Sequence, residues 1–163
     1  MAGILLLFGF IILSVTVIVI AGAWKIFQKA GQEGWKCLIP FYNAVVLLKI
    51  IGKPTWWILP LCVPFIISAG ISIAAPTNSG AQLIGMALNI IGYVYLVWAY
   101  NMLSKSFGKT EGFTVGLIFL GFIFIPILGF GDARYLGPFG DKVAFEAYNG
   151  NNRFDFEDNK LAD

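Results

Sequence analysis

Four long stretches without a charged residue limit what this chain can fold into. They cover residues 2–23, 56–75, 81–103 and 113–131. A helix needs about 20 apolar residues to cross a hydrocarbon core of roughly 30 Å. The composition agrees, because 58% of the residues are hydrophobic and only 12% are charged, against about 25% charged in soluble proteins. The sequence therefore predicts an all-α membrane protein in which residues 1–138 form one domain with four transmembrane helices.

The first apolar stretch has two interpretations, a transmembrane helix or a cleaved signal peptide. Ala21, Gly22 and Ala23 resemble a signal-peptidase cleavage site. No positively charged region precedes the stretch, however, and it is longer than the usual apolar core of about 7–15 residues. We therefore expect residues 2–23 to remain as a transmembrane helix.

A basic segment, residues 24–55, connects the first two predicted spans. It begins with residues 24–32, whose polar side chains recur at helical spacing and make the stretch amphipathic. The apolar run 41–51 would reach only about 16 Å as a helix. We expect residues 24–51 to lie in the membrane interface or to enter the membrane and return, and a fifth crossing by residues 37–51 is the alternative. The lysines of this segment are expected to contact lipids: Lys25, Lys29, Lys36, Lys49 and Lys53.

Several motifs in and after this segment resemble a known family. The string AWKIFQKAGQEGWKCLIPFYN is followed by IGKPTWW, SKSFGK and PILGFGDARYLGP. In this order the motifs are similar to an uncharacterised family of bacterial polytopic membrane domains, some of which occur joined to signal peptidases. The resemblance covers Ile18 to Pro138 and implies a small multi-pass membrane protein. It implies no known activity, and the serine–lysine catalytic domain of a signal peptidase is not among these residues.

The lysines also predict an orientation. With four spans, the connectors 24–55 and 104–112 fall on one side of the membrane and hold seven lysines, whereas the turn 76–80 holds none. Short loops rich in lysine remain in the cytoplasm. We therefore expect a protein of the bacterial inner membrane with both connectors in the cytoplasm. The N-terminus and the C-terminal tail are then expected outside it.

The third apolar stretch carries a stripe of polar and small residues at helical spacing. Its members are Gln82, Gly85, Asn89 and Tyr93. Such a stripe favours packing against a neighbouring helix, with Asn89 forming an interhelical hydrogen bond. The alternative is that Asn89 contacts a substrate or an ion.

The sequence lacks the usual signs of catalysis and of cofactor binding. It contains no histidine, the commonest zinc ligand, and its two cysteines, Cys37 and Cys62, predict no disulfide framework. No predicted span has a charged residue at its centre, where ion-coupled transporters usually keep one. We therefore expect no enzymatic activity, no cofactor, no metal site and no binding of nucleic acid.

From residue 139 to residue 163 the chain becomes polar and acidic. We expect this tail to bind a partner outside the cytoplasm through its aromatic residues, because aromatic anchors carry much of the energy of an interface. These residues are Phe145, Tyr148, Phe154 and Phe156. The leading hypothesis is an accessory subunit that stabilises or assembles a larger membrane complex and binds other membrane-protein subunits. The alternative is a small transporter, channel or lipid-handling protein.

Overall fold

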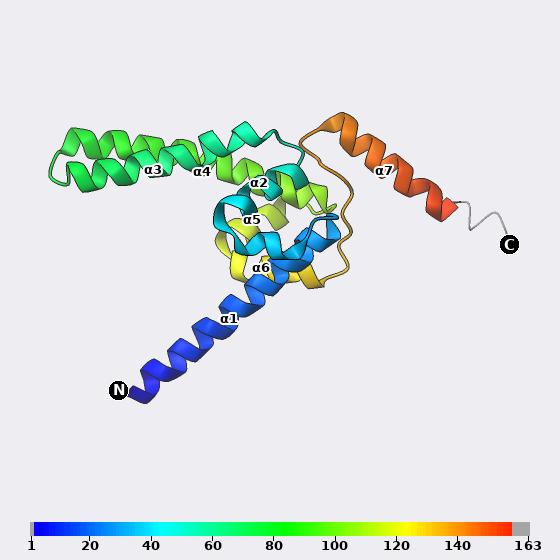
Figure 1. Ribbon diagram of the computed structural model, residues 1–163, viewed down its shortest axis with the longest axis horizontal. Helices are drawn as coiled ribbons and strands as arrows, with labels where there is room; N and C mark the ends of the chain where they lie inside the picture. Colours follow the sequence, from blue (N-terminus) through cyan, green and yellow to red (C-terminus); the bar gives the residue numbers. More distant parts are fainter. Residues whose placement is uncertain (1, 158–163) are drawn as a thin grey trace.

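A computed structural model describes residues 2–157, and every regular element in this range is a helix. The predicted all-α class is thus confirmed for these residues. The elements, shown in Figure 1, are α1 (Ala2–Lys29), η1 (Gly34–Leu38), α2 (Pro40–Ile50), η2 (Thr55–Trp57), α3 (Ile58–Ala74), α4 (Ser79–Ser106), α5 (Glu111–Phe119), α6 (Gly121–Phe130) and α7 (Lys142–Glu157). The two η elements are short 3-10 helices.

Within residues 2–157, three helical segments are long and apolar enough to cross a membrane. They are Leu6–Lys29 in α1, Thr55–Ala74 in η2 and α3, and Ser79–Ser106 in α4. The chain is therefore compatible with a membrane protein. α1 is longer than the first predicted span, because no residue that ends a helix follows until Gly31, whose φ is 71°. The amphipathic stretch predicted after residue 23 thus continues α1.

The prediction of one continuous fourth helix over residues 113–131 is wrong. The chain bends at Leu120 and forms two short helices, α5 and α6. Phe124 of α6 folds back onto α5, where its ring centroid lies 5.0 Å from that of Phe113. The same ring occupies the space that a side chain at Gly116 would fill. Hydropathy alone could not reveal the bend, because the segments on both sides of it are apolar.

α5 and α6 pack against each other as the two sides of a V, and α5 also contacts α4 while α6 contacts α1. α5 begins beside the last turn of α4, where the hydroxyl of Ser104 donates a hydrogen bond to the carbonyl of Thr110 at 3.2 Å. α6 ends beside the last turn of α1, because the ammonium of Lys29 contacts the carbonyl of Leu128. The two helices therefore bring the chain back to the end of the molecule at which α4 ends and α5 begins.

The segment after α6, residues 131–141, crosses the ends of α4 and α2, and we call it the strap. The N–H of Leu136 donates to the carbonyl of Ser106 at 2.7 Å, and that of Gly140 donates to the carbonyl of Ile51 at 2.6 Å. The tail thus begins at the same end of the molecule as both lysine-rich connectors. The predicted placement of the tail opposite the connectors depended on a fourth span over residues 113–131, and it stays a prediction.

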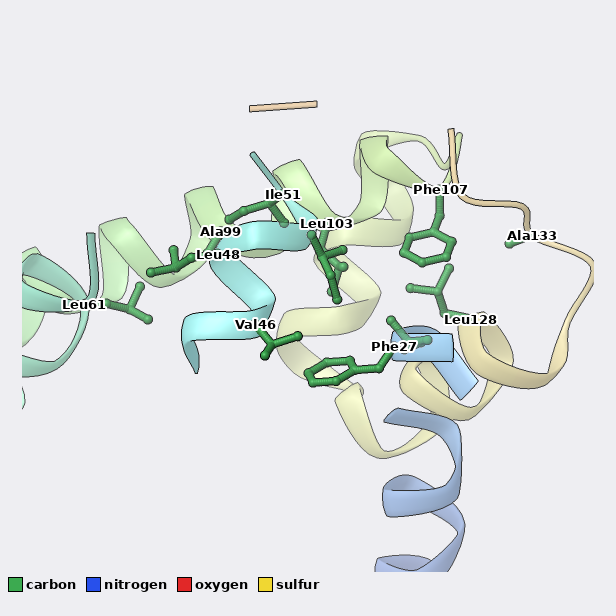
Figure 2. Packing of buried hydrophobic residues seen from close by; sticks show 12 residues of the cluster. Phe27, Val46, Leu48, Ile51, Leu61, Ala99, Leu103, Phe107, Leu128 and Ala133 are labelled. Atoms are coloured by element: carbon green, nitrogen blue, oxygen red, sulfur yellow. The ribbon is translucent and has the colours of Figure 1, made fainter. Parts of the chain in front are cut away.

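The buried core lies where these helix ends meet. We call this region the hub; it consists of the end of α1, α2, the first turn of α3, the last turns of α4, the α5–α6 pair and the strap. Figure 2 shows its apolar side chains, with Phe107 and Leu128 facing one another. The core residues are Ile26, Phe27, Val46, Leu48, Ile50, Ile51, Leu61, Ala99, Leu103, Phe107, Leu128 and Ala133. Because α2 contributes several of them, part of the segment predicted to lie against the membrane belongs to the protein core.

Two apolar arms extend from the hub, α1 in one direction and the α3–α4 hairpin in another (Figure 1). Apolar side chains on both arms are largely uncovered, with Phe10 72% and Ile73 84% exposed. α1 packs against α6 and η1 but makes no extensive contact with α3 or α4. The arms therefore present bare apolar surface that the described residues do not cover.

Candidate functional site

The hub begins with a close crossing of α1 and α6. A side chain at Gly129 would collide with the backbone of Gly22, and a Cβ at Gly22 would lie 2.9 Å from the Cα of Pro126. Small residues let helix backbones approach in this way in membrane proteins. The crossing brings the end of α6 beside the last turn of α1.

Lys29, in that last turn of α1, closes the end of α6. Its ammonium donates hydrogen bonds to the carbonyls of Leu128, at 2.9 Å, and Gly131, at 2.6 Å. The last carbonyls of a helix have no partner within it and carry the negative end of the helix dipole, so a lysine there stabilises the helix. Lys29 was expected to contact lipid, but the structure engages its ammonium inside the hub.

Two buried serines at the end of α4 hold the chain that follows. The hydroxyl of Ser106 accepts a hydrogen bond from the N–H of Phe139 at 3.1 Å, and its carbonyl accepts the bond from the strap described above. Ser104 and Ser106 are both 0% exposed. Lys105 lies between them in sequence and forms an ion pair with Glu111 at 3.3 Å. These contacts are structural, because each hydroxyl bonds to backbone.

Tyr135 fastens the middle of the strap to α2. Its hydroxyl donates a hydrogen bond of 2.6 Å to the carbonyl of Ile50. Its ring packs against Phe107, at 5.4 Å between centroids, and against Tyr148 of α7, at 5.3 Å. Burial, with a smaller contribution from Tyr148, raises the pKa of Tyr135 well above the ordinary value for tyrosine. Tyr135 is therefore a neutral donor across the physiological pH range.

Sequence reasoning did not identify Ser106 or Tyr135 as residues that join the hub. The available signal was the motif GFGDARYLGP, in which a polar run directly follows a glycine-rich apolar stretch. A tyrosine near the end of a membrane helix is typical of the aromatic belt, and this common pattern concealed its bond to α2.

The other lysines of the basic segment have different surroundings. Lys36 forms an ion pair of 3.2 Å with the neighbouring Glu33. The ammonium of Lys53 lies over the ring of Trp57, 4.9 Å from its centroid. Lys25 and Lys49 are exposed. Only part of the positive charge of this segment is therefore directed away from the protein.

Three members of the polar stripe, Gln82, Gly85 and Asn89, lie between α3 and α4. The side-chain amide of Asn89 donates to the hydroxyl of Ser68 on α3 at 2.8 Å, and that of Gln82 donates to the carbonyl of Ala75 at 3.1 Å. A Cβ at Gly85 would lie 3.2 Å from the same Ser68 hydroxyl. The stripe thus joins the two helices of the hairpin.

Tyr93, the fourth member, lies at the edge of this contact. Its ring packs edge-on against Phe65 of α3, at 5.2 Å between centroids, while 58% of its surface is exposed. On the exposed face of α4, Tyr93 also borders a groove of about 350 Å³. The lining residues of this groove are Ile90, Tyr93, Val94, Val97 and Trp98. Asn89 is not among them.

The aromatic residues of the tail divide into two pairs. Phe145 packs edge-on against Phe139 of the strap, at 5.3 Å, and Tyr148 contacts Tyr135 as described above. Phe154 and Phe156 belong to the last turns of α7, and their side chains lie outside the part of the chain whose side chains the structure describes. The first two turns of α7 therefore pack against the strap.

The described part of the chain defines the class of protein: it is all-helical and has three apolar helices of membrane-spanning length, which are joined at a compact hub. Within that class, the chain belongs to a family of unknown function, DUF5684, whose model matches residues 35–138. The motifs placed the start of the family at Ile18, whereas the match leaves out α1 as well as α7. The resemblance to an uncharacterised family is thus confirmed. No curated protein and no solved structure matches the chain.

Proposed function

We propose that this protein is an accessory subunit that stabilises or assembles a larger membrane complex and has no catalytic activity of its own. The observation that carries the proposal is the pair of bare apolar arms. α1 and the α3–α4 hairpin extend from one hub without packing along each other. Large uncovered apolar faces suit contacts with lipid and with other membrane-protein subunits, because small and apolar side chains pack readily against a neighbouring helix.

The proposed membrane placement has three spans, with the α5–α6 pair entering the bilayer and returning. α5 and α6 contain 9 and 10 residues, and at 1.5 Å per residue each reaches only about 15 Å, half of a hydrocarbon core. The lysine-rich connectors and the strap then share one side. The positive-inside rule makes this side the cytoplasm of a bacterial inner membrane, with the N-terminus outside.

The exposed parts of the hub suggest two kinds of contact, one with lipid headgroups and one with a protein partner. Lys25 and Lys49 are free to approach anionic lipid headgroups, since both are exposed. α7 projects from the hub (Figure 1), and its exposed residues, such as Val143 at 79%, offer a surface to a partner in the cytoplasm. The side proposed here differs from the one predicted from the sequence, because α5 and α6 return the chain to the hub.

The alternative, a transporter or channel with its path beside Asn89, receives less support. Its discriminating feature would be a cavity lined by Asn89. The amide of Asn89 instead bonds to Ser68 between two packed helices, and the groove on α4 lies on another face. Interhelical hydrogen bonds of this kind are common in membrane bundles without transport activity.

Purification of the native protein in mild detergent tests the proposal. We expect the full chain to co-purify in a complex larger than a monomer, identified by size-exclusion chromatography and mass spectrometry. A chain ending at Asp141 removes α7 but keeps the strap with its bond to Ile51. If α7 contacts the partner, this variant inserts normally but leaves the complex, and its full retention would assign the contact to the arms. A protein found alone and monomeric would contradict the proposal.

A further inference from the structure

The groove on the exposed face of α4 leads along the arm toward the hub. Its volume is about 350 Å³, and all of its lining side chains are apolar or aromatic. Each is at least 40% exposed, so the groove is open to the surroundings along its length. α4 runs from the tip of the hairpin to the hub (Figure 1), so Ile90 lies at the distal end and Trp98 at the hub end. From Ile90 to Trp98 the groove spans about 12 Å of helix, and an open apolar surface of this kind suits part of a hydrocarbon chain.

At the hub end, the groove continues into a cluster of aromatic rings. Trp98 stacks on Trp57, with centroids 6.2 Å apart and planes 27° apart. Tyr95 packs edge-on against both, at 5.5 Å from Trp57 and 6.0 Å from Trp98. Tryptophan and tyrosine prefer the level of the lipid headgroups, because one part of each ring system is apolar and another is polar. The cluster therefore marks the boundary between hydrocarbon and headgroups.

A lysine also contacts this cluster. The ammonium of Lys53 sits 4.9 Å from the centroid of the Trp57 ring, and its side chain is only partly buried. Within the described residues, no carboxylate lies within ion-pair distance of it. Stacking on Trp57 holds the cation in place without neutralising it. Lys53 thus offers an uncompensated positive charge at the end of an apolar groove.

We propose that the groove and Lys53 together bind one anionic phospholipid, with an acyl chain along α4 and the phosphate at Lys53. The positive charge of Lys53 lies at one end of the apolar groove. A phospholipid likewise carries its phosphate at one end of its acyl chain. This inference depends on the arms lying in a membrane and is independent of the accessory role.

Binding is measured by native mass spectrometry of the full chain in detergent, with phosphatidylglycerol as the probe and phosphatidylcholine as the neutral lipid. We expect one phosphatidylglycerol to bind more tightly than phosphatidylcholine. Lys53→Gln should weaken that binding about fivefold, which corresponds to the worth of one lysine beside an anionic surface. Lys109→Gln is the matched control, because the ammonium of Lys109 also lies over an aromatic ring, 5.8 Å from the centroid of Phe113, which is not part of the aromatic cluster. This variant should bind as the unchanged protein does.

A second variant tests the groove separately from the charge. Val94 is 53% exposed, so Val94→Trp fills the groove without disturbing the core, and we expect it to weaken binding as well. Glycerol 3-phosphate, which has the headgroup charge but no chain, should not compete. Equal losses for Lys53→Gln and Lys109→Gln would overturn the proposal. Unchanged binding in Val94→Trp, or competition by glycerol 3-phosphate, would overturn it too, because either result means that a headgroup binds without the groove.

Discussion

Lys29 and Gly131 are 102 residues apart in the sequence, yet the ammonium of one lies 2.6 Å from the carbonyl of the other. This bond joins the end of the first arm to the end of the α5–α6 pair. It also explains why α6 can stop inside the hub, since the carbonyls at its end would otherwise lack a partner. A single basic residue thus connects a segment outside the matched family region to one inside it.

Replacing Lys29 by methionine tests the importance of this bond. Lys29→Met keeps a long apolar stem but leaves the carbonyls of Leu128 and Gly131 without their donor. We expect the free energy of unfolding in detergent to fall by about 1–3 kcal/mol. Lys25→Met, at an exposed position of the same helix, should change it by less than about 0.5 kcal/mol. Equal effects of the two substitutions would show that Lys29 acts only through its charge.

The crossing of α1 and α6 should tolerate no additional atom. Gly129→Ala forces a methyl group into the backbone of Gly22, so the helices must separate. We expect destabilisation of about 1–3 kcal/mol, measured by thermal unfolding in detergent. Gly9→Ala is the control on α1, where nothing lies within 4 Å of the added methyl group, and it should be neutral or slightly stabilising. A neutral Gly129→Ala would contradict the close crossing.

Tyr135 should make stability depend on pH in the alkaline range. Burial raises its pKa in the folded protein, so the folded state holds the proton more tightly than the unfolded state. This contribution is fully present below the unfolded pKa of about 10 and is lost as the pH rises from there toward the folded value.

The substitution Tyr135→Phe separates this effect from that of other groups. It removes the hydrogen bond to Ile50 and should cost about 1 kcal/mol at neutral pH. The variant should also lose part of the decline in stability above pH of about 10. The measurement is chemical unfolding at a series of pH values. An unchanged alkaline decline would mean that other residues cause it.

The return of the chain at Leu120 predicts that the tail and the connectors react from the same side of the membrane. Single cysteines are introduced at Lys49, Glu146 and Gly3 after the native Cys37 and Cys62 are replaced by serine. We expect an impermeant maleimide to label positions 49 and 146 in inverted vesicles and position 3 in right-side-out vesicles. Labelling of position 146 together with position 3 would instead support four crossings.

The bond between Asn89 and Ser68 should contribute modestly to the hairpin. Asn89→Ala and Ser68→Ala are combined in a double-mutant cycle, and the coupling is read from unfolding in detergent. We expect about 0.6 kcal/mol, the average for hydrogen bonds between membrane helices. Asn101→Ala is a comparison elsewhere on α4 and should show no coupling to Ser68. A coupling near zero would mean that the contact between Asn89 and Ser68 is incidental to packing.

Parts of this protein could be predicted from the sequence because their cause is local. Residues 2–23, 56–75 and 81–103 are long, apolar and uncharged, and each became a helix long enough to span a membrane. The helical spacing of Gln82, Gly85 and Asn89 placed them on one face, and that face lies against α3. Helix length and periodicity are properties of a segment alone, so no knowledge of the remaining chain was needed.

Only the tertiary structure decided the conformation of residues 113–131 and the contacts of the basic segment. The hydropathy of residues 113–131 is the same whether they form one long helix or a V of two short helices. The V depends on the ring of Phe124 packing onto Gly116. Lys29 resembles a membrane-surface lysine in sequence, and its role depends on two carbonyls about a hundred residues away. The sequence by itself determined which segments are apolar helices. Packing between segments determined how residues 113–131 bend and where α6 ends. Contacts between distant residues leave no mark in the hydropathy or periodicity of either segment that makes them.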